Sequence, residues 1–144
     1  MEYKILNKIK SPDDVKKLDK SQLDLLCDEI RYDIIDVVSK NGGHLASSLG
    51  AVELTVALHR AFSSPQDAII FDVGHQSYAH KLLTGRFDEF PTLRKEGGIS
   101  GFMRPSESEH DPFVTGHSIN SISAAYGLKK EKSILVENGT TIPE

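Results

Sequence analysis

A long amphipathic helix is predicted for residues 21–41, because apolar side chains recur there every three or four positions. Ser21 and Asp24 resemble a capping box at its start. Gly42 and Gly43 can end it, because glycine tolerates the left-handed conformation common after helices. One apolar stripe on so long a helix has to pack against other elements. The stripe consists of Leu23, Leu26, Ile30, Ile34, Val37 and Val38.

Helical and strand-like segments alternate along the rest of the chain. The residue 84–116 segment has little periodicity and many glycine, proline and charged residues, as functional or disordered loops do. The alternation predicts an α/β domain with a short parallel sheet flanked by helices. Besides the long helix, we expect helices at 12–18, 51–62, 78–83 and 118–130, a buried strand at 68–71 and a second strand at 133–136.

Length and charge narrow the class of protein. A chain of 144 residues fits one domain, and it contains no apolar run long enough to span a membrane. A net charge of −4 argues against a nucleic-acid partner. The single cysteine, Cys27, excludes an internal disulfide and is interpreted as a packing residue. With no apolar leader at the amino terminus, a cytoplasmic protein is expected.

Three histidines stand at glycine turns beside predicted regular elements. His44 and His75 each follow a glycine, and His75 comes just past the carboxyl end of a predicted strand, where α/β proteins bind ligands. Gly116, His117 and Ser118 open a predicted helix, whose free N–H groups suit a phosphate. The alternatives stay open at this point: ordinary turn histidines, and a glycine and serine that simply begin a helix.

The remaining histidines are given structural roles. His59 and His80 fall within or beside predicted helices, and His110 lies in the charged segment 106–111, which is interpreted as a solvated loop. No pair of histidines has the short spacing of a known zinc motif, so no metal ligands are assigned.

Several blocks of residues, in one order and spacing from about 10 to 128, resemble the amino-terminal part of 1-deoxy-D-xylulose-5-phosphate synthase. Transketolase shares only the general layout. The blocks are Gly42–Gly50 with Val52–Thr55 and Ala57–His59, Phe71–Lys81 with Leu83–Arg86, Gly97–Phe102 with Ser106–Asp111, and Gly116–Ser118 with Ser121–Ala125.

The resemblance implies a transferase that depends on thiamine diphosphate and Mg²⁺. It would condense pyruvate with glyceraldehyde 3-phosphate, releasing carbon dioxide, and its product would feed isoprenoid, thiamine and pyridoxal synthesis. By the same resemblance, His75 lies at the reactive end of the cofactor and His44 lines the substrate site. Gly116, His117 and Ser118 contact the cofactor. The protein would supply orientation and proton transfer, while the cofactor supplies the carbanion chemistry.

The chain also departs from the family. The family's Gly-Asp-Gly metal block is absent, and residues 129–144 diverge from its pattern. We therefore expect residues 1–144 to form a single incomplete domain, with a partial thiamine-diphosphate-binding, transketolase-like fold. It should be inactive alone, needing the remainder of the enzyme or a second chain, and should form a homodimer. The alternative is a non-catalytic binding or interaction protein derived from the synthase fold.

Overall fold

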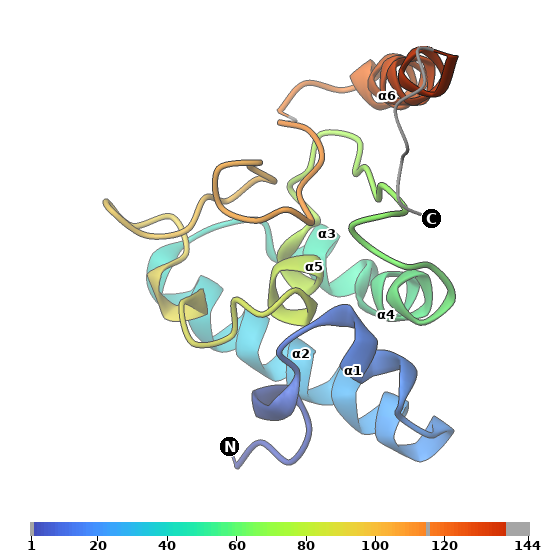
Figure 1. Ribbon diagram of the computed structural model, residues 1–144. Helices are drawn as coiled ribbons and strands as arrows, with labels where there is room; N and C mark the ends of the chain where they lie inside the picture. Colours follow the sequence, from blue (N-terminus) through green and yellow to red (C-terminus); the bar gives the residue numbers. More distant parts are fainter. Residues whose placement is uncertain (1, 115, 138–144) are drawn as a thin grey trace.

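The computed structural model of the protein describes residues 2–114 and 116–137, and of residues 134–137 the backbone alone. The described part is helical. Five helices, α1 to α5, pack together, and α6 stands apart from them, joined through a long segment whose one regular element in the described residues is a short 3₁₀ turn (Figure 1). The helices are α1 (Pro12–Lys16), α2 (Lys20–Asn41), α3 (Leu45–Gly50), α4 (Val52–Ala61), α5 (Tyr78–Leu83) and α6 (Asn120–Glu137), with short 3₁₀ turns η1 (Leu6–Lys8) and η2 (Phe90–Thr92).

The long helix α2 begins slightly before the predicted position. Its capping box is formed by Asp19, which accepts from the Gln22 N–H at 2.9 Å, and by Gln22, whose side chain accepts from the Asp19 N–H at 2.9 Å. The interpretation of Ser21 as the cap is therefore wrong. Gly42 ends the helix at a φ of 73°, as the sequence predicts.

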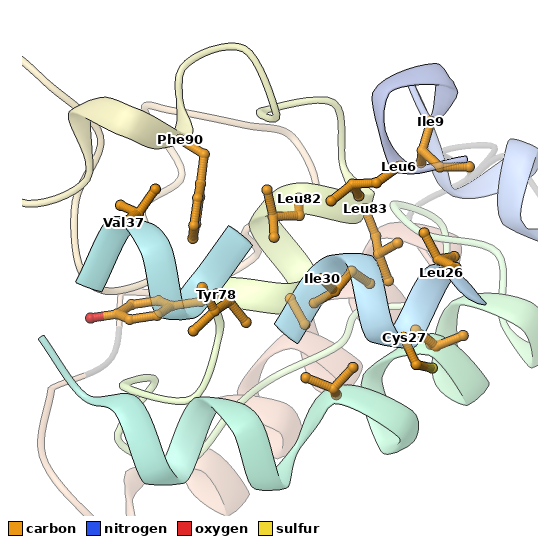
Figure 2. Close-up of a cluster of buried hydrophobic side chains, with 14 of the residues drawn as sticks. Leu6, Ile9, Leu26, Cys27, Ile30, Val37, Tyr78, Leu82, Leu83 and Phe90 are labelled. Carbon is orange, nitrogen blue, oxygen red and sulfur yellow. The ribbon is translucent and has the colours of Figure 1, made fainter. Parts of the chain in front are cut away.

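The core lies between α2, α5 and the turns on either side of them. Figure 2 shows Ile30 and Val37 of α2 facing Tyr78, Leu82 and Leu83 of α5. Side chains from η1 and η2 close this cluster at its two ends. Cys27 is buried in it, in agreement with its interpretation as a packing residue, and burial raises the pKa of its thiol to about 11.

The predicted parallel sheet is wrong: no strand occurs among residues 2–114 and 116–137. The segment 68–71 has no regular structure, and Ile69 and Phe71 instead bury their side chains against Met103. Residues 133–136 continue α6. Short apolar runs fit a buried strand or a buried helix equally well. Without a second strand, the first has no neighbour with which to form a ladder.

The segment 84–116, described except for residue 115, is anchored by buried side chains. It contains η2 and buries Phe90, Leu93, Ile99 and Met103. No helix in the described residues is long and apolar enough to cross a membrane.

Candidate active site

The structure brings two of the sequence-predicted histidines together. His44 immediately precedes α3, and His75 lies in the turn before α5. Their ring centroids are 5.0 Å apart, with an interplanar angle of 70°. His44 is exposed and His75 is half-buried. Residues 31 positions apart in the chain thus present two imidazoles to one place on the surface.

Buried hydroxyl groups fix the backbone at both histidines. Ser48 Oγ donates to the carbonyl oxygen of His75 at 3.2 Å, and the His44 N–H donates to Tyr78 Oη at 3.4 Å. Ser77 Oγ donates to the carbonyl oxygen of Gly74 at 2.7 Å. The hydroxyl-bearing residues come from α3, from α5 and from the position just before α5, so α5 contacts the turns of both histidines.

Gly43 allows the backbone before His44 to approach the side chains of Tyr78 and Arg94. Its φ is 140°, and a Cβ added there would lie 2.7 Å from Tyr78 Oη and 3.4 Å from Arg94 Cδ. Any other residue would be strained at this φ and would have to displace the Tyr78 hydroxyl. The glycine before His44 is therefore required by its contacts, and those contacts show that the Arg94 side chain lies beside the His44 turn.

Arg94 is a residue that the sequence reasoning missed. Its side chain also packs on Gly101, whose added Cβ would lie 3.2 Å from Arg94 Cγ. It lines a cavity of about 390 Å³, together with Lys95, Arg104 and the 97–102 loop. Phe102 of that loop lies 6.5 Å from His44, ring centroid to ring centroid. A cationic cavity therefore adjoins the histidine pair, and no spacing in the sequence signals it.

The segment Gly116–Ser118 is connected to the His75 turn through Asp72. The carboxylate of Asp72 accepts from the Ile119 N–H, at 2.9 Å and 3.1 Å to its two oxygens. This bond, followed by smaller contributions from Ser121, holds the pKa of Asp72 below its usual range. In the described residues, no hydrogen bond or ring contact joins His117 to His44 or His75. The sequence reasoning also missed that Asp72 connects the His75 turn to the segment that follows Ser118.

Two observations test which ligand groups this site fits. The Nδ1 atom of His75 is buried and has no hydrogen-bond partner among the described residues, so it is available to a polar atom of a ligand. By contrast, the described part of the chain has no group of three His, Cys, Asp or Glu residues that could hold a metal ion. The site fits an organic ligand with a polar atom at His75, and within the described residues it offers no such cation site of its own.

A buried polar network includes two side chains of α5, His80 and Lys81. Asp111 is 1% exposed and accepts from Arg86 Nη1 and Nη2, both at 2.8 Å, from the Arg104 N–H at 2.8 Å and from His80 Nε2 at 3.1 Å. The interpretation of segment 106–111 as a solvated loop is thus wrong for Asp111. A charge run in sequence cannot show that one carboxylate meets a guanidinium from 25 residues earlier.

A second buried ion pair extends the network. Lys81 Nζ is 0% exposed and donates to Glu107 Oε2 at 2.6 Å. The other oxygen of Glu107 accepts from the Ser100 N–H at 2.7 Å. Two carboxylates and two cations therefore meet here, with Glu107 half-buried and the other three groups buried, so the charges of the network balance.

The two buried histidines of the network are neutral, and their tautomers follow from their partners. Asp111 only accepts, so His80 carries its proton on Nε2, and His80 Nδ1 accepts from His59 Nε2 at 2.9 Å. Burial lowers the pKa of His59 to about 3, and the electrostatic effects of His80, His110, Arg86 and Lys16 lower it further. Burial also lowers the pKa of His80, against the opposing effect of Asp111. Both keep the structural roles predicted for them.

Comparison with known proteins gives one family. The sequence profile of 1-deoxy-D-xylulose-5-phosphate synthase matches residues 6–143, which include most of the tail beyond Leu128. A synthase of Thermus thermophilus is 58% identical over 134 residues, covering 93% of this chain and 22% of that protein. Synthase 2 of Geobacter sulfurreducens is 55% identical over 139 residues, covering 96% and 22%. The chain thus spans about a fifth of the length of these curated relatives.

Proposed function

Because the chain belongs to the 1-deoxy-D-xylulose-5-phosphate synthase family, we propose that it forms the amino-terminal part of a synthase active site. The reaction would be the condensation of pyruvate with glyceraldehyde 3-phosphate, with loss of carbon dioxide. The observation that carries the proposal is the pairing of His44 and His75, whose rings lie 5.0 Å apart. The product would enter isoprenoid, thiamine and pyridoxal synthesis, in the cytoplasm.

The cofactor of this site would be thiamine diphosphate. When bound, it would supply the carbanion chemistry that the side chains of a protein lack. The unpartnered Nδ1 of His75 supports placing that residue against a polar atom of the cofactor. The connection through Asp72 supports a role for Gly116, His117 and Ser118 in holding the cofactor near the same turn. Mg²⁺ would have to find its ligands elsewhere than in a carboxylate cluster of the described residues.

The two histidines would move or hold protons. Imidazole can donate or accept a proton near neutral pH, and His75 and His44 face each other from two separate turns. Either ring could donate to an oxygen on which negative charge develops. Arg94, Lys95 and Arg104, which line the adjoining cavity, would attract anionic substrates such as a carboxylate or a phosphate ester.

We propose that the 144-residue chain is inactive alone and acts with the remainder of a synthase or with a second chain, as part of a homodimer. His44 is exposed, so the described residues do not exclude water from its ring, as an active site requires. The second candidate function, a non-catalytic interaction protein, is favoured by the apolar surface of α6 and the residue before it. Ile119, Ile122 and Tyr126 are each more than 70% exposed there.

A chimera tests the proposal. The matched amino-terminal segment of the Thermus thermophilus synthase would be replaced by this chain, and release of carbon dioxide from pyruvate would be measured with glyceraldehyde 3-phosphate present. We expect turnover, and a loss of about 100-fold or more in His75→Gln, as for removal of a general acid or base. His110→Asn is the matched histidine control, because His110 faces Ser64 at 2.9 Å and not the pair. A folded chimera without turnover would refute the proposal.

A further inference from the structure

Helix α5 depends on its neighbours for both its stability and its position. It has six residues, all of them buried. A helix this short is not stable in isolation, because its few hydrogen bonds do not offset the cost of nucleation. Tertiary contacts therefore set both the position and the orientation of α5 in the molecule.

One face of α5 is held by the apolar core and the other by the buried polar network. Tyr78, Leu82 and Leu83 pack against α2 (Figure 2). His80 and Lys81 are both 0% exposed and make hydrogen bonds to Asp111 and Glu107. Apolar packing tolerates small displacements, whereas hydrogen bonds and ion pairs have defined directions. The network thus fixes the rotation of α5 about its axis and its position along that axis.

Both turns of the histidine pair are tied to α5. The His44 N–H donates to Tyr78 Oη in the first turn of the helix. Ser77, the residue just before the helix, donates to the carbonyl of Gly74, next to His75. A displacement of α5 would move these two partners and thereby change how the two imidazoles face each other.

We propose that Asp111 is a positioning residue, which sets the arrangement of His44 and His75 through Arg86, His80 and helix α5. The proposal rests on the proposed function only for what the pair does once it is in place. The partners of Asp111 are Arg86, His80 and the Arg104 backbone, so its hydrogen bonds reach neither histidine of the pair directly.

The carboxylate is required because all of its partners are donors. It accepts two bonds from Arg86, one from His80 and one from the Arg104 N–H. An asparagine has nearly the same shape, but it carries no charge and turns an NH₂ group toward one set of donors. Arg86 then loses its bidentate partner while it is still buried, and because Glu107 lies at 3.6 Å from Arg86 Nη1, we expect the guanidinium to shift toward that carboxylate. Arg86 also donates to Thr84 at the end of α5, so its movement reaches the helix directly.

The test is nuclear magnetic resonance of the 144-residue chain with labelled histidine. The readouts are the ring signals of His44 and His75 and the nuclear Overhauser effect between the two rings. In Asp111→Asn, we expect both sets of signals to shift and the ring-to-ring effect to weaken or vanish. The His59–His80 hydrogen bond, seen through the ring nitrogen shifts, should change in the same variant.

Glu29→Gln provides the matched control. Glu29 is 0% exposed, and its carboxylate accepts from the backbone N–H groups of Lys4, Ile5 and Leu6 at 2.7, 3.1 and 2.7 Å. It is therefore another buried carboxylate with several donors, held by α2 and not by α5. We expect it to leave the signals of the pair in place. If Asp111→Asn leaves the pair unchanged, or if Glu29→Gln moves it equally, the proposal is overturned.

Arg86→Lys keeps the proposal falsifiable should Asp111→Asn fail to fold. Lysine retains the positive charge but donates as a point charge and not through a planar fork. We expect a smaller shift of the His44 and His75 signals in the same direction, and no shift would overturn the proposal. Because no cofactor is added, the result is independent of whether the chain binds thiamine diphosphate. A shift of the pair would therefore support the positioning role even if the chimera shows no turnover, and a chimera without turnover would count against the proposed function alone.

Discussion

The buried His59 predicts that the protein loses stability on mild acidification. Burial lowers the pKa of His59 to about 3 in the folded chain, with further lowering by His80, His110, Arg86 and Lys16. In an unfolded chain, a histidine has a pKa of about 6.5. Between these two values the unfolded chain binds a proton that the folded chain does not, so the free energy of unfolding falls as the pH falls.

The size of the effect follows from the two pKa values. Below about pH 6.5, each unit of pH removes up to about 1.4 kcal/mol of stability for one such group. From about pH 7 to about pH 5, the loss amounts to about 2 kcal/mol for His59 alone. Burial lowers the pKa of His80 and of His110 as well, so those histidines act in the same direction. Burial raises the pKa of Asp33, which acts in the opposite direction at the acidic end of this range.

Urea unfolding at about pH 7, 6 and 5, followed by circular dichroism, measures the effect. His59→Gln is the informative variant, because the glutamine amide can still donate to His80 Nδ1 but does not titrate. The other titratable groups contribute nearly equally to the pH dependence of stability in the wild type and in His59→Gln, so their contributions largely cancel in the difference. We expect the stability advantage of the wild type over His59→Gln to shrink by about 2 kcal/mol from about pH 7 to about pH 5. Parallel curves would refute the reasoning.

Two further perturbations follow from the packing. In Gly98→Ala, the new Cβ would lie 2.1 Å from the carbonyl oxygen of Thr92; we expect a loss of about 1–3 kcal/mol in urea unfolding. Gly50→Ala, which meets nothing within 4 Å, should lose nothing, and equal losses would contradict the account. Ile122→Gln with Tyr126→Gln should reduce self-association in light scattering, because both side chains are more than 70% exposed on α6. A wild type that is already monomeric at high concentration would contradict that expectation.

The helical part of the fold could largely be predicted from the sequence. The apolar period of α2 and the glycine after it were sufficient to place that helix to within about two residues. The sheet could not be predicted reliably, because a run such as 68–71 is apolar whether it pairs with a strand or packs on Met103. Hydrophobic periodicity is a property of one segment, whereas a sheet forms only when two segments pair as strands.

The candidate site was only partly accessible from the sequence. Glycine turns indicate where a histidine can approach a ligand, and His44 and His75 both lie at such turns. Their 5.0 Å approach depends on Ser48, Ser77 and Tyr78, whose contacts cross the chain and follow no spacing rule. Asp111 was missed for the same reason, since its partners come from α5, the Arg86 turn and its own loop. The roles of the two histidines in catalysis stay predictions.

The most direct test of the account adds thiamine diphosphate to the labelled 144-residue chain and follows the rings of all six histidines. Weak binding is sufficient, because shifts can be followed at millimolar ligand. We predict saturable shifts of His75, His44 and His117, with the buried His59 and His80 unchanged. Saturable shifts that are absent from His75, or that appear only at the buried pair, would contradict the assignment of this surface as part of a synthase active site.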